Sequence, residues 1–97
     1  MTALRLARRL APRADWHRAM GGRLAILQAG PFHLRCYVGD GKDAGRWSVR
    51  ILWEPLKPAT VILWSSSRTE KRHGDPEEAL MAALGWLRSI RAGLEKV

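Results

Sequence analysis

Arginine offers the most obvious chemistry in this 97-residue chain, where 17 Lys and Arg outnumber nine Asp and Glu and give a formal net charge of +8. Only four of the basic residues are lysines. The planar guanidinium fork of arginine fits phosphate and carboxylate groups, so this excess predicts an anionic partner. The competing explanation is a GC-rich genome that favours arginine codons.

One candidate binding surface lies on a predicted sheet. Arg35 and Tyr37 alternate with apolar residues along one strand, Arg50 lies on the next strand, and Trp64 lies on a third. Arginines interleaved with aromatic rings on an open sheet can hold single-stranded nucleic acid, because bases stack on the rings while guanidinium groups meet phosphate. The alternative is that the N-terminal helix covers this face.

A second candidate surface combines the N-terminal helix with a polar loop. Residues 1–23 carry six arginines and one aspartate, a net charge of +5, so an anionic partner is expected to involve this segment. Basic helix faces and loops commonly contact phosphates. The predicted contacts are Arg5, Arg8 and Arg9 on the helix and Arg68, Lys71 and Arg72 in the loop. A solvated surface without a ligand is the alternative.

Catalytic and metal signatures are lacking in the sequence. The glycine-rich residues 39–45 do not have the spacing of a phosphate-binding loop. Three serines at 65–67 near His73 and Asp75 lack the elbow of a hydrolase triad. Cys36 lies three residues from His33 on a strand, so the two side chains face opposite sides and Cys36 is predicted to be a small core residue. We therefore expect no enzyme, no cofactor and no metal site.

The strands follow from alternating apolar residues. Residues 47–53 place Trp47, Val49, Ile51 and Trp53 on one face, which predicts a central strand with two tryptophans in the core. Residues 59–65 form another strand. Residues 24–38 predict either a hairpin or one long strand with a bulge at Gly30, and the pattern leaves both open.

The helices flank the strands. Residues 3–11 have an apolar stripe that Pro12 ends, with Trp16 or Met20 as the expected contact, and residues 15–20 are predicted as a further helical turn. Asp75, Pro76 and Glu78 carry the signals of a helix start, and the stripe that follows is typical of a helix covering a sheet.

These patterns predict one α+β domain over residues 1–97: a basic helical segment at 1–22, a three- or four-stranded antiparallel sheet at 23–66, and a helix at 75–94 packed on one sheet face. No apolar run approaches the ~20 residues that span a bilayer, so no membrane association is expected. One cysteine allows no internal disulfide, which fits a cytoplasmic protein.

Two functions fit these features. The first is a small non-enzymatic protein that binds nucleic acid through an arginine-rich surface. The second is a protein-interaction module or inhibitor that binds an acidic protein surface. Small phage accessory proteins, such as anti-CRISPR or anti-restriction inhibitors, are comparable in size and in their lack of motifs. Neither the partner nor the oligomeric state follows from the sequence.

Overall fold

The computed structural model describes residues 2–56, 59–66 and 74–90. The elements in chain order are α1 (Ala3–Leu10), β1 (Trp16–Ala19), the 3₁₀ turn η1 (Met20–Gly22), β2 (Leu24–Ala29), β3 (Phe32–Val38), the 3₁₀ turn η2 (Gly41–Asp43), β4 (Trp47–Leu56), β5 (Ala59–Ser65) and α2 (Pro76–Ile90). The expected α+β class, with an antiparallel sheet, a short N-terminal helix and a C-terminal helix, is confirmed.

The sheet has five strands in the order β1-β2-β3-β4-β5, so the prediction of three or four strands was wrong. The additional strand is β1, which replaces the helical turn expected at residues 15–20. Trp16 is buried opposite Leu27 of β2, and its indole N–H donates to the carbonyl oxygen of Ala11 at 2.9 Å. This burial favours the strand over a local helical turn. Trp16 therefore contacts the C-terminal end of α1, as one of the two expected contacts.

Residues 24–38 form a hairpin, one of the two predicted alternatives. β2 and β3 pair antiparallel from Leu24 opposite Tyr37 to Ala29 opposite Phe32. Gly30 has a φ of 59° and is followed by Pro31, whose ring fixes φ near −65°. This sequence of φ signs is that of a type II′ turn, which matches the twist of antiparallel strands.

Both helices begin at a hydrogen-bonded cap. In α1, the Thr2 hydroxyl accepts from the Arg5 N–H at 3.2 Å. In α2, the Asp75 carboxylate accepts from the Glu78 N–H at 2.8 Å, while the Glu78 carboxylate accepts from the Gly74 N–H at 3.2 Å. In a standard capping box, the Glu78 carboxylate would accept from the N–H of the cap residue Asp75, whereas here it accepts from the preceding residue, Gly74. The predicted start of this helix is confirmed.

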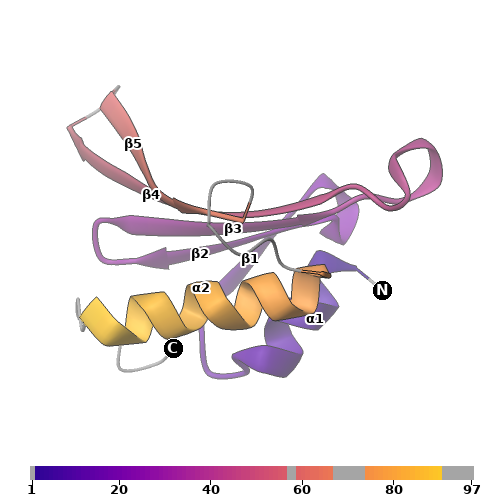
Figure 1. Ribbon diagram of the computed structural model, residues 1–97, viewed down its shortest axis with the longest axis horizontal. Coiled ribbons are helices and arrows are strands. Elements are labelled where there is room, and N and C mark those ends of the chain that lie inside the picture. Colours follow the sequence, from indigo (N-terminus) through magenta and orange to yellow (C-terminus); the bar gives the residue numbers. More distant parts are fainter. Residues whose placement is uncertain (1, 57–58, 67–73, 91–97) are drawn as a thin grey trace.

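The helices form one layer, and the sheet forms the other (Figure 1). α1 contacts β1, β2 and β3, α2 contacts β3 and β4, and the two helices also contact each other. The largest fully buried side chains between the layers are Leu34, Cys36, Val49, Ile51, Leu80, Leu84 and Leu87. Because α1 shares the face that α2 covers, the alternative in which α1 lies over the opposite face is wrong.

The stretch at residues 47–53 belongs to β4, an inner strand next to the middle one. Val49 and Ile51 are fully buried, as their spacing predicted. Trp47 is only partly buried, and Trp53 is 37% exposed. The core under β4 is therefore centred on two aliphatic residues, and the tryptophans lie nearer the margins of the helical layer.

Candidate binding site on the open face of the sheet

The face of the sheet that points away from α1 and α2 displays a regular array of side chains. Residues that are paired across antiparallel strands share a face, so the register defines three cross-strand triplets on β2, β3 and β4. We call this array the open-face grid. Its cross-strand triplets are Leu24–Tyr37–Ser48, Ile26–Arg35–Arg50 and Gln28–His33–Leu52. None of its nine side chains is acidic.

The centre of the grid places two positive charges side by side. Arg35 of β3 is directly opposite Arg50 of β4, and both side chains are exposed. Neither guanidinium forms an ion pair within the described part of the chain. Like charges at directly opposed positions destabilise a sheet. An anion seated between the two guanidinium groups would remove that repulsion.

Acidic groups described elsewhere on the chain have partners of their own. Asp15 lies 3.7 Å from the imidazole of His17, and Asp40 lies 3.5 Å from the guanidinium of Arg23. These pairs leave the positive centre of the grid without a described carboxylate beside it. The local field there favours an anionic ligand.

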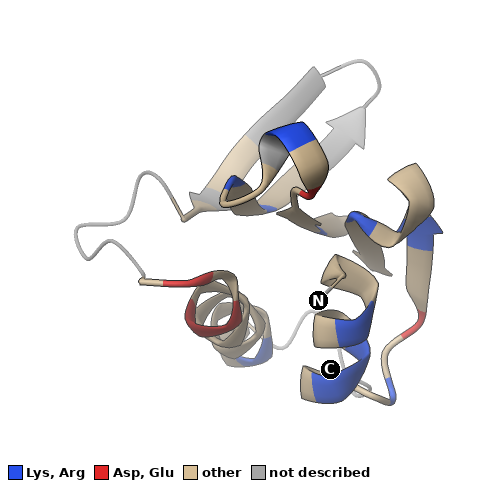
Figure 2. Cartoon of the chain, turned by 90° about the vertical axis from the view of Figure 1, so that its right-hand side faces the viewer, with Lys and Arg blue, Asp and Glu red and all other residues tan. Residues whose placement is uncertain are grey.

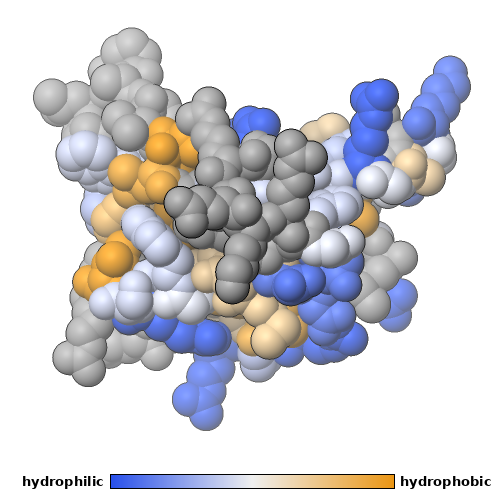
Figure 3. All heavy atoms as spheres, in the orientation of Figure 1, coloured by the Kyte–Doolittle hydropathy of each residue, from blue (hydrophilic) through white to orange (hydrophobic). Residues whose placement is uncertain are grey.

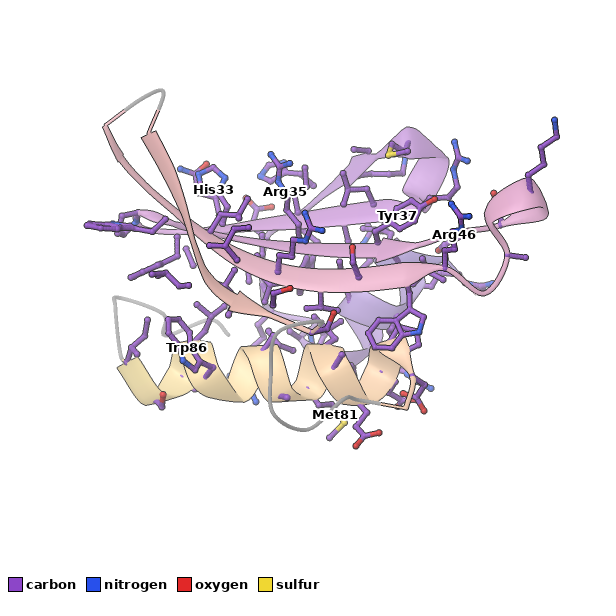
Figure 4. The ribbon with its side chains drawn as sticks, turned by 45° about the horizontal axis from the view of Figure 1, so that its top comes forward. His33, Arg35, Tyr37, Arg46, Met81 and Trp86 are labelled. Atoms are coloured by element: carbon purple, nitrogen blue, oxygen red, sulfur yellow. The ribbon has the colours of Figure 1, made fainter. Side chains whose placement is uncertain are left out.

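Two rings flank Arg35 on β3. His33 and Tyr37 lie two residues before and two residues after it, so all three side chains emerge from the same face (Figure 4). His33 and Tyr37 are half-buried, whereas Arg35 is exposed. Tyr37 also takes part in an interaction within the molecule. The strand therefore presents three planar groups in a line.

The predicted arginines of the N-terminal helix lie elsewhere. Arg5, Arg8 and Arg9 are exposed on α1, and Figure 2 shows the basic segments of α1 in the helical layer, away from the open face. Arg9 is paired with Glu77 of α2 at 2.6 Å, so its charge is locally matched. The structure therefore brings Arg35, Arg50 and Tyr37 together and separates them from the arginines of α1.

The remaining predicted contacts fall outside what can be described. Arg68, Lys71 and Arg72 belong to residues 67–73, which lie outside the described ranges. The backbone of Trp64 pairs with Ile51 in β5, but its side chain is likewise outside the described part. The loop and Trp64 therefore remain sequence predictions.

Comparisons with protein-family models, with curated proteins and with solved structures found no match to this chain. The geometry of the open face is therefore the basis for a functional proposal.

Other chemistry on the described chain is sparse. Cys36 is fully buried on the core side of β3, as predicted, and burial raises the pKa of its thiol to about 12. Within the described residues, no three His, Cys, Asp or Glu side chains gather where they could hold a metal ion. Neither α1 nor α2 has the length and apolar character needed to cross a bilayer.

Sequence reasoning did not propose His33, Gln28, Ser48, Leu24 or Ile26 as contacts. The signal that would have found them is the strand register. That register depends on the hairpin at Gly30 and on the pairing of β3 with β4, and periodicity within a single strand cannot supply it.

Proposed function

We propose that this protein is a non-enzymatic nucleic-acid-binding protein whose open-face grid holds the phosphate backbone. The observation that carries the proposal is the directly opposed pair Arg35 and Arg50, exposed at the centre of an acid-free array. Guanidinium groups bind phosphate oxygens through charge-assisted, bidentate hydrogen bonds. Two such groups on neighbouring strands can hold one phosphate between them or two successive phosphates.

The arrangement also accounts for the choice of residues around the pair. Gln28 and Ser48 supply neutral hydrogen-bonding groups at the corners of the grid, and Leu24 and Ile26 supply apolar surface beside Arg35. Such neighbours leave the positive potential intact. A surface built only to keep a protein in solution has no need for two opposed arginines on a strand pair, because both signs of charge serve that purpose.

Binding is tested by fluorescence anisotropy with labelled single strands and duplexes of the same length, at about 50 mM and about 200 mM salt. The double variant R35Q/R50Q should weaken binding by about 10-fold or more at the lower salt, because charged hydrogen bonds to phosphate are lost. Its plot of log affinity against log salt should be shallower by about 1.4 to 1.8, the value for two phosphates.

The matched control is R5Q/R8Q, which removes the same charge from α1 in the helical layer. This control should change affinity by less than about threefold, through the smaller net charge alone. Equal losses in the two double variants would contradict a site on the sheet. So would the absence of binding to any nucleic acid at micromolar protein.

An acidic protein surface is the second candidate partner, and one observation favours it. Trp53, Leu63 and Ile90 are 37%, 38% and 39% exposed, and apolar surface gathers toward the end of the molecule where β4 and β5 lie (Figure 3). Protein interfaces often combine arginine with large apolar side chains. Co-purification of one stoichiometric protein that Leu63→Ser releases, with no oligonucleotide binding, would favour this candidate.

A further inference from the structure

We infer that the nucleic acid bound by the open-face grid is single-stranded, with bases lying against the row His33, Arg35 and Tyr37 of β3. This inference rests on the proposed function and adds the class of nucleic acid. Its basis is the spacing of the three planar groups, their exposure and the apolar residues beside them (Figure 4).

The spacing of the row does not suit stacked bases. Alternate residues of a strand are roughly 6.8 Å apart, since each residue rises about 3.4 Å. Bases in a duplex follow one another at about 3.4 Å on each strand, half of that distance. Bases that lie on successive groups of the row must therefore be separated from one another. A single strand can splay its bases in this way, whereas a duplex must first lose its pairing.

The side chains of the row have the shapes that bases stack on. Tyrosine and histidine rings and the plane of an arginine guanidinium all serve as stacking platforms in proteins that bind single strands. Tyr37 and His33 are each half-buried, so their rings are supported by the sheet while part of each surface remains open to a ligand. Such support reduces the conformational entropy that binding would otherwise remove.

On its β2 side, the row has two apolar neighbours and no charged one. Leu24 and Ile26 flank Tyr37 and Arg35 on β2, and both are partly exposed. Apolar surface is covered favourably by the faces of bases and not by phosphates. A grid with only two formal charges also offers few contacts to a duplex, whose outer surface is lined with phosphate on both strands.

The test measures the affinity of the wild-type protein for three oligomers of equal length: a single strand, a duplex, and an abasic single strand that keeps the sugar-phosphate backbone. The single strand should bind at least about fivefold more tightly than the abasic strand, since stacking contributes that much or more per base. It should also bind more tightly than the duplex. These comparisons need no variant.

Variants of Tyr37 then locate the stacking. Tyr37→Leu should weaken single-strand binding by about fivefold or more and leave abasic binding unchanged, whereas Tyr37→Phe should stay within about twofold of wild type because it keeps the ring. If Tyr37→Leu does not fold, His33→Ala takes its place.

The outcomes separate this inference from the function on which it rests. Equal affinity for the three oligomers, together with weaker binding by R35Q/R50Q, would overturn the single-strand inference and leave the phosphate site in place. No binding to any of the oligomers would overturn both.

Discussion

Arg35 and Arg50 are an unfavourable pair in the protein without a ligand. Directly opposed side chains on antiparallel strands have Cβ atoms about 4.5–5.5 Å apart, and like charges there reduce stability. The pair persists at the centre of the grid although its strands are otherwise well matched: Leu34 and Ile51 pair on the buried side of the same two strands. Under the proposed function, an anion bound between the two guanidinium groups would offset this cost.

Arg50→Gln should therefore stabilise the protein while it weakens binding. Removing one of two opposed charges should raise the free energy of unfolding by about 0.2–1 kcal/mol. Urea denaturation measures the change, and Arg5→Gln is the control because it lowers the net charge equally without touching a cross-strand neighbour. A loss of stability in Arg50→Gln would mean that the guanidinium has a favourable partner, which would contradict the repulsion inferred between Arg35 and Arg50.

Cys36 gives a residue-scale prediction on the opposite side of β3. Its thiol has a pKa raised from 9.0 to about 12 by burial, so the folded protein keeps the proton at pH values where the unfolded chain loses it. The contribution of the buried thiol to the free energy of unfolding is then fully present below about pH 9. It declines between pH 9 and 12, by up to about 1.4 kcal/mol per pH unit. Cys36→Ala should lack this part of the decline in denaturation curves.

Thiol labelling checks the same point at neutral pH. The native protein should react with a thiol reagent only as fast as it unfolds, because the thiolate is the reactive species and the side chain has no exposed surface. Rapid labelling of the native protein would show that β3 is not packed as described.

At the scale of elements, β5 is anchored to β4 by Ser66, the residue that follows it. Ser66 is buried, its hydroxyl accepts from the Val49 N–H at 3.2 Å, and its own N–H donates to the Val49 carbonyl at 2.9 Å. The serine therefore continues the pairing one residue beyond β5 and satisfies a donor of β4.

Ser66→Ala should lower the free energy of unfolding by about 1–3 kcal/mol, since it leaves the buried Val49 N–H without its acceptor. Thermal or urea denaturation measures this, with Ser89→Ala as the control because Ser89 is exposed and its hydroxyl donates to the Trp86 carbonyl within α2. The control should change stability by less than about 0.5 kcal/mol. Equal effects would show that the Ser66 contact is not formed in solution.

The elements that were predicted are those with local signals. The cap at Asp75, the proline after α1 and the alternation in β3 and β4 are each readable within a few residues. β1 was missed because its four residues are too few to show a period, and its strand form depends on Trp16 packing under α1 and beside Leu27. Local patterns cannot report such distant contacts.

At the scale of the whole molecule, the two-layer arrangement separates the arginines of α1 from those of the grid. Both helices cover one face of the sheet, so the arginines of α1 and those of the grid cannot act as one patch. Composition alone predicted an anionic partner near the N-terminal segment, because counting charges along the chain says nothing about which face they occupy. The candidate site could be predicted only in part: Arg35 and Tyr37 follow from one strand, whereas the opposition of Arg35 and Arg50 needs the register.

The most direct test of the account maps binding by NMR chemical shifts of the backbone amides during titration with a short single-stranded oligonucleotide. The largest shifts are expected for amides of β3 from His33 to Tyr37 and of β4 from Ser48 to Leu52. Amides of the β2 residues whose side chains belong to the grid should shift slightly less. Amides of α1, including Arg5 and Arg8, should move little. Shifts concentrated on α1, or no shifts at millimolar oligonucleotide, would contradict a binding site on the open face of the sheet.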